Sequence, residues 1–185
     1  MVIDAGHGGW DPGKVTEDVL EKNINLQIAL KLQNYLEQGG SIVMMTRITD
    51  EALGDKKNSD LQSRRNLSAL SKADILISIH QNSYPDENVR GAQVFYYSRS
   101  EKSKMLAEFI QAEIKNFADT SNKREITPND DYYLLKQTEI PAVIIECGFL
   151  SSASERERLV TREYQEKIAW AIYKGIVNYF EATRE

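Results

Sequence analysis

The chain has one cysteine, two histidines and no excess of positive charge. The single cysteine, Cys147, excludes an internal disulfide and any zinc site built from several cysteines. The net charge is -5 and the pI is near 5.2, which argues against nucleic acid as a partner because phosphates need basic patches. No apolar run approaches the roughly 20 residues that span a bilayer, so we predict no membrane-spanning segment.

A secretory leader is also missing from the sequence. Met1 stands directly before an apolar run that begins at Val2, with no basic stretch ahead of it. We therefore expect an export segment in the natural precursor, upstream of Met1. The length of 185 residues suits one domain with a sizeable core, and no linker, repeat or low-complexity stretch divides it. The sequence predicts a single domain over residues 1–185.

Apolar, β-branched runs alternate with helical patterns along the chain. Near-continuous apolar strands separated by helices predict an α/β fold, with a mostly parallel sheet covered by helices on both faces. The strands are expected at residues 2–5, 41–47, 74–80, 92–97 and 142–146. Helices are expected near 20–38 and 59–72, from a capping box of Ser98 and Glu101 to Phe117, and from Tyr164 to Phe180, with a surface loop at 118–131.

The two histidines occupy matching positions. His7 lies in "DAGHGG" and His80 in "LISIHQNS", and each follows or ends an apolar strand pattern. Ligands of open α/β sheets gather at the carboxyl ends of strands, and imidazole is the commonest metal ligand. One such histidine is more often a hydrogen-bonded loop residue. Because both histidines of the chain lie at such ends, the pattern favours a shared metal site.

Two glutamates complete the candidate site. Catalytic zinc usually takes three protein ligands and a water, and two histidines with one glutamate are a known set. Glu21 shares a helix face with Ile24, Ile28 and Leu32, so its carboxylate is expected to face the core and to need a partner. Alternatively, it merely favours the helix dipole. Glu146 ends the strand "PAVIIE" on the same rim, where it suits proton transfer or, alternatively, a structural ion pair.

Five motifs together indicate a family. They are "IDAGHGGWDPG", "LEKNINLQIALKL", "TRITD", "ADILISIHQNS" and "IPAVIIECGFLSS", and they run from end to end of the chain. On these motifs the chain resembles the zinc-dependent N-acetylmuramoyl-L-alanine amidases of the third amidase type, which cleave bacterial peptidoglycan. The resemblance implies a twisted sheet of about six strands, zinc ligands at His7, Glu21 and His80, and a catalytic glutamate at Glu146. It also implies a substrate contact at Asn82.

The implied reaction is hydrolysis of the amide between N-acetylmuramic acid and the L-alanine of the stem peptide. Zinc-activated water would attack, with a glutamate as base. The stretches "DYYLLKQTEIPAVIIECGFLSS" and "YQEKIAWAIYKGIVNYF" look most like the sporulation and germination branch, which acts on spore cortex peptidoglycan. The resemblance therefore implies an extracytoplasmic location in the cell wall or spore cortex, and an activating or targeting protein is a candidate partner.

Two other functions fit parts of the pattern. A cysteine hydrolase could use Cys147 with His80, although a lone cysteine in an apolar run is more often an inert packing residue. By strand alternation, Cys147 is also expected to point away from Glu146. A catalytically inactive wall-binding module is the other alternative, and the intact set of two histidines and two glutamates argues against it.

Overall fold

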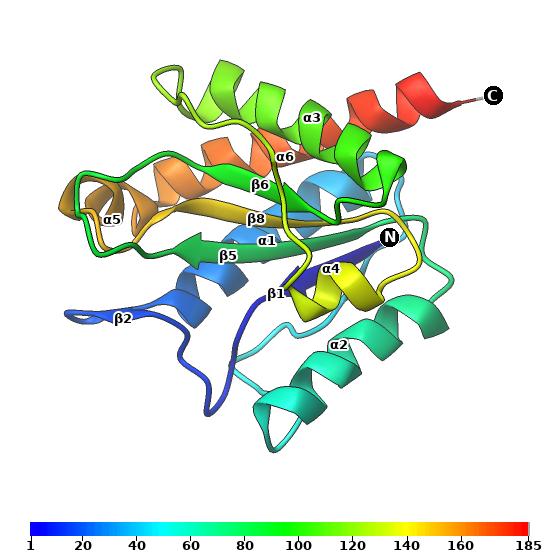
Figure 1. Ribbon diagram of the computed structural model, residues 1–185, viewed down its shortest axis with the longest axis horizontal. Helices are drawn as coiled ribbons and strands as arrows, with labels where there is room; N and C mark the ends of the chain where they lie inside the picture. Colours follow the sequence, from blue (N-terminus) through cyan, green and yellow to red (C-terminus); the bar gives the residue numbers. More distant parts are fainter. Residues whose placement is uncertain (185) are drawn as a thin grey trace.

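The computed structural model describes residues 1–184, which form a sheet between two layers of helices (Figure 1). The six strands lie in the order β4-β1-β5-β8-β6-β7. Their bounds are β1 Val2–Ala5, β4 Met44–Met45, β5 Leu76–Asn82, β6 Gln93–Tyr96, β7 Thr127–Pro128 and β8 Ala142–Phe149. Strands β4, β1, β5 and β8 run parallel, and β6 pairs antiparallel with β8. The predicted mostly parallel sheet of about six strands is confirmed.

Helices cover both faces of this sheet. On one face, α1 and α3 pack against the long helix α6; on the other lie α2 and the short helix α4 (Figure 1). The bounds are α1 Glu21–Gln38, α2 Lys57–Leu70, α3 Glu101–Glu113, α4 Tyr133–Gln137 and α6 Arg162–Thr183. None of the helices described is long and apolar enough to cross a membrane.

Alternation along the strands divides the core in two. In β8, Ile145 and Cys147 face the large apolar cluster under α1, α3 and α6, whereas Ala142 and Ile144 face a smaller cluster under α2 and α4. The same alternation sends Glu146 toward the α2 and α4 side. The alternation therefore decides which side chains of β8 lie on the same side of the sheet as Glu146.

The expected elements differ from the observed ones at several ends. The strand predicted at 41–47 is reduced to β4, because only Met44 and Met45 pair with β1 while Ile42 is 89% exposed. The helix cap predicted at Ser98 is wrong. Ser100 caps α3 by accepting the amide of Ser103 at 3.2 Å, and Ser98 instead hydrogen bonds to Asp130.

Other elements were not predicted. The loop expected at 118–131 contains β7, which extends the sheet beside β6. A hairpin of β2 Val15–Thr16 and β3 Val19–Leu20 precedes α1, and α5 Ala153–Leu159 follows β8. The two-residue strands and α5 are too short to carry a periodic signal. The helix expected to Phe117 is observed as α3 and a π-helical turn, η1 Ile114–Ala118, that continues it.

Candidate metal centre

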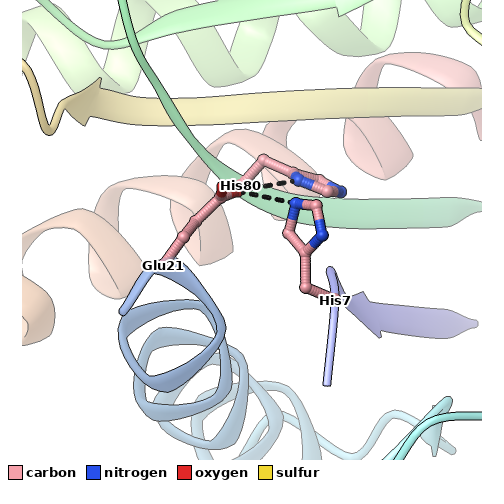
Figure 2. Close-up of side chains that lie close together, drawn as sticks. All are labelled: His7, Glu21 and His80. Carbon is pink, nitrogen blue, oxygen red and sulfur yellow. Dashed lines mark hydrogen bonds and ion pairs between the residues drawn. The ribbon is translucent and has the colours of Figure 1, made fainter. Parts of the chain in front are cut away.

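Three predicted ligands converge at the carboxyl edge of the sheet (Figure 2). His7 follows β1, His80 belongs to β5, and Glu21 is the first residue of α1. Oε1 of Glu21 lies 3.2 Å from Nε2 of His7 and 3.0 Å from Nδ1 of His80. All three ligand atoms lie within 4.8 Å of one another. Ligands of a tetrahedral zinc, at bonds of ~2.1 Å, stand about 3.4 Å apart, so the spacing suits one ion.

The glycines around His7 allow this close approach. His7 itself has a φ of +62°, in the left-handed region. A Cβ at Gly6 would lie 2.2 Å from the His80 ring, and one at Gly13 would lie 2.5 Å from Oε2 of Glu21. Gly13 also has a φ of +66°. Glycine is therefore needed at both positions, because any side chain there would displace a candidate ligand.

A second carboxylate orients His7. Oδ2 of Asp11 lies 2.7 Å from Nδ1 of His7, and Oδ1 of Asp11 accepts the amide of Gly13 at 3.1 Å. A proton on Nδ1 shared with Asp11 leaves Nε2 facing Glu21. A metal-binding histidine is usually held in this way, with its other ring nitrogen bonded to a carboxylate. Burial alone would lower the pKa of His7, but the hydrogen bonds to Glu21 and Asp11 raise it to about 9. The sequence analysis missed Asp11, although it lies four residues after His7.

Backbone and amide donors hold the carboxylate of Glu21, which is 4% exposed. Oε2 accepts the amide of Lys14 at 2.8 Å, and Oε1 accepts the amide of Gln81 at 3.1 Å and the Asn25 side chain at 3.2 Å. Burial alone would raise the pKa of Glu21, but the hydrogen bonds from His7 and His80 bring that pKa far below the usual range. The carboxylate is therefore ionised. Asn25 follows Glu21 by one helical turn, so the helix face could have indicated it.

Buried charges beneath the site fix the end of β1. Arg64 on α2 forms an ion pair with Asp4 at 2.6 Å and donates to the main-chain oxygen of His7 at 2.8 Å. Asp4 also accepts the hydroxyl of Ser78 at 2.6 Å. Arg47 donates to the main-chain oxygen of Gly6 at 3.1 Å. The loop that carries His7 is thus held from below by two guanidinium groups.

Glu146 lies beside the three ligands without a cationic partner. It stands opposite His80 in the pairing of β5 with β8, and it lines the same cavity of about 400 Å³ as His7, Glu21 and His80. Among residues 1–184 its Oε2 is buried with no hydrogen-bond partner, and no lysine or arginine forms an ion pair with it. Burial raises its pKa to about 7. The arrangement suits proton exchange rather than a structural ion pair.

The remaining candidate residues lie apart from the cavity. Cys147 is 0% exposed in the large apolar cluster, on the opposite side of β8 from Glu146, and burial raises the pKa of its thiol. That position is unsuited to a nucleophile. Asn82 ends β5 and its side chain accepts the amide of Ser83 at 2.8 Å; it does not line the cavity. Its contact with substrate stays a prediction.

Several known proteins are similar to this chain in sequence and fold. A family model described as N-acetylmuramoyl-L-alanine amidase matches residues 1–178. The germination-specific N-acetylmuramoyl-L-alanine amidase of Bacillus subtilis (strain 168) is 38% identical over 189 residues, covering 97% of this chain and 79% of that protein. The CwlD amidase of Clostridioides difficile, solved in complex with the GerS lipoprotein, is 43% identical with a TM-score of 0.95 and 98% of both chains covered. An N-acetylmuramoyl-L-alanine amidase of Clostridium difficile 630 is 33% identical, with a TM-score of 0.90 over 99% of this chain and 97% of that one.

Proposed function

This chain belongs to the N-acetylmuramoyl-L-alanine amidase family, and from that premise we propose that it is a zinc-dependent hydrolase of spore cortex peptidoglycan. It cleaves the amide between N-acetylmuramic acid and the L-alanine of the stem peptide. His7, Glu21 and His80 hold the zinc ion, and Glu146 is the catalytic acid and base. The convergence of two imidazole nitrogens and one carboxylate oxygen beside a buried, unpaired glutamate carries the proposal.

The donor set fits zinc. Two histidine nitrogens and a glutamate oxygen form a known catalytic ligand set that leaves a position open for water or substrate. When bound, zinc would supply a Lewis acid for the amide carbonyl and lower the pKa of water toward ~7. Asp11 would hold His7 in the tautomer that presents Nε2, and the ionised Glu21 would supply the negative charge that a cation needs.

Glu146 would carry the proton during hydrolysis. Its pKa of about 7 leaves a large fraction ionised at neutral pH, so the carboxylate can accept the proton of the attacking water. The unpartnered Oε2 is available for this transfer. The same group then returns the proton to the amine of L-alanine as the bond to the lactyl carbonyl breaks. A pKa near neutrality suits both directions, because neither protonation state is strongly favoured.

The substrate and relatives support a location and a partner. Peptidoglycan lies outside the cytoplasm, so we infer that the chain acts there, as a single domain over residues 1–185. The CwlD relative was solved with a lipoprotein, GerS, which supports a protein partner that activates or targets this chain.

Metal analysis combined with mass spectrometry of digested cortex peptidoglycan tests the proposal. The purified protein should bind one zinc and release stem peptides with a free L-alanine amine. Glu21→Gln should lose zinc and activity, because it keeps the shape of the side chain but removes the charge. Glu37→Gln is the matched control, since Glu37 lies near the other end of α1 and its side chain accepts a hydrogen bond only from Gln33 in the described chain. Full zinc occupancy in Glu21→Gln would refute the ligand assignment, and intact peptidoglycan after treatment with zinc-loaded protein would refute the activity.

A further inference from the structure

A tyrosine at the start of α4 reaches the cavity that holds Glu146. Tyr132 lines that cavity together with His7, Glu21 and His80. Given the proposed function above, we propose that Tyr132 is a positioning residue whose hydroxyl donates a hydrogen bond to the Glu146 carboxylate and fixes it for proton transfer. The role differs from that of a metal ligand, because Tyr132 would act on the reaction only through Glu146.

The ring of Tyr132 is anchored to the strand beside Glu146. It packs edge-on against Phe95, with ring centroids 5.7 Å apart and an interplanar angle of 81°. The amide of Tyr132 donates to Oδ1 of Asn129 at 2.9 Å, and the amide of Asn129 donates to the main-chain oxygen of Tyr96 at 2.8 Å. Phe95 and Tyr96 belong to β6, which pairs directly with β8. Phe95 stands opposite Ile144, two residues before Glu146 on β8, so the ring of Tyr132 is held on the same side of the sheet as Glu146.

The electrostatics keep the hydroxyl a donor. Burial, followed by the nearby charge of Glu146, raises the pKa of Tyr132 to about 12, so its hydroxyl keeps its proton at neutral pH. Burial raises the pKa of Glu146, and a hydrogen bond donated by Tyr132 would oppose that rise. Oε2 of Glu146 has no partner in the described chain. In the proposed arrangement the tyrosine hydroxyl donates to one carboxyl oxygen, and the other oxygen is left to exchange the proton.

Two other roles would place the same ring in this wall. The hydroxyl could contact the substrate directly, or the ring could only fill space between α4 and β6. Direct contact with substrate would act independently of Glu146. A purely packing role would change stability without changing turnover in a folded variant. Both can be separated from positioning by measurement.

Steady-state kinetics of the zinc-loaded full chain provide the first test. Tyr132→Phe keeps the ring against Phe95 and removes the hydroxyl. We expect kcat to fall by about 10- to 100-fold, as for the loss of a hydrogen bond to a charged group, with KM, zinc content and melting temperature unchanged. Tyr97→Phe is the matched control, because Tyr97 packs against the same small apolar cluster but does not line the cavity. Wild-type kcat in Tyr132→Phe, or a change in KM alone, would overturn the inference.

A double-mutant cycle then asks whether Tyr132 acts through Glu146. In a Glu146→Gln background, Tyr132→Phe should cause no further loss of kcat, because the carboxylate that it positions is already gone. A further loss equal to that in the wild-type background would overturn positioning and indicate an independent contact. Wild-type activity in Glu146→Gln would overturn the proposed function itself. A loss in Glu146→Gln with none in Tyr132→Phe would overturn only the role of Tyr132.

Discussion

Removing the Arg64 side chain should destabilise the protein more than any ordinary surface substitution. The Arg64 guanidinium is 3% exposed, forms ion pairs with Asp4 and Asp60, and donates to the main-chain oxygen of His7. Arg64→Met keeps the length and the apolar stem but removes every donor. Asp4, whose side chain is 1% exposed, would retain only the hydroxyl donors of Ser78 and Thr46.

The expected magnitude follows from the burial of that pair. Removing one partner of a buried ion pair costs about 3–5 kcal/mol, because the other charge is left without compensation. For a domain of this size 1 kcal/mol lowers the melting temperature by about 2–4 °C, so Arg64→Met should melt about 6–20 °C below the wild type. Thermal and urea unfolding followed by circular dichroism measure this. Arg65→Met, at a half-buried neighbour on α2 that donates to the main-chain oxygen of Gln137, should cost about 1 kcal/mol or less.

The stability difference between the wild type and Arg64→Met should also depend on pH, in a direction that the pKa of Asp4 determines. Burial alone would raise the pKa of Asp4, but Arg64 and Ser78 lower it to about 2. A lowered pKa contributes stability that is present above the unfolded value near ~3.9 and is lost as the pH falls through about 2. Without Arg64, burial prevails and the pKa of Asp4 rises. Lowering the pH then protonates Asp4, which removes its uncompensated buried charge and restores part of the stability of the variant. The gap between wild type and Arg64→Met should narrow from about pH 7 toward about pH 4. A gap that widens, or costs in Arg64→Met and Arg65→Met that match, would refute the reasoning.

The metal-free protein should lose stability as the pH rises from about 6.5, the ordinary pKa of histidine, to about 9, the raised pKa of His7, because the protonated form of His7 is the one that the fold stabilises. Zinc should reverse this trend, because it takes the place of the proton on His7. Urea unfolding at several pH values, with and without zinc, measures the effect. A free energy of unfolding that does not change with pH in either case would contradict the prediction. Asp11→Asn should weaken zinc binding by about 10- to 100-fold in competition with a chelator, and unchanged affinity would show that Asp11 does not orient His7. Cys147→Ala should cost about 1–2 kcal/mol in urea unfolding through a small cavity yet retain chelator-sensitive activity; a folded but inactive variant would restore the cysteine mechanism.

The fold and the proposed ligands were predictable because their signals are local. Strand runs and helix stripes repeat within a few residues, and His7, Glu21 and His80 each lie at a recognisable strand end or helix face. A topological rule then brings the strand ends together. The opposite orientations of Glu146 and Cys147 followed from the same kind of reasoning, since alternation along one strand needs no knowledge of the neighbours.

The supporting residues were not predictable in this way. Arg64 lies 60 residues from Asp4, and nothing in the pattern of α2 distinguishes it from its neighbour Arg65. Tyr132 directly follows the predicted surface loop at 118–131, and its place in the wall of the cavity that Glu146 lines depends on β7 and on the packing of Phe95. Such contacts arise from tertiary packing between segments without periodicity. Sequence reasoning therefore identifies the groups that do the chemistry more readily than the groups that hold them.

Two glutamates at one edge of the sheet are given opposite properties by their surroundings. Glu21 and Glu146 are both buried, so desolvation pushes the pKa of each upward. Glu21 receives hydrogen bonds from His7, His80 and main-chain amides, and those donors more than offset burial and keep it ionised. Glu146 lacks comparable donors, so burial prevails and its pKa rises to about 7. A permanently ionised carboxylate suits a cation ligand, whereas one that titrates near neutrality suits a proton carrier. Exchanging the two roles would require moving the donors, because the side chains themselves are identical.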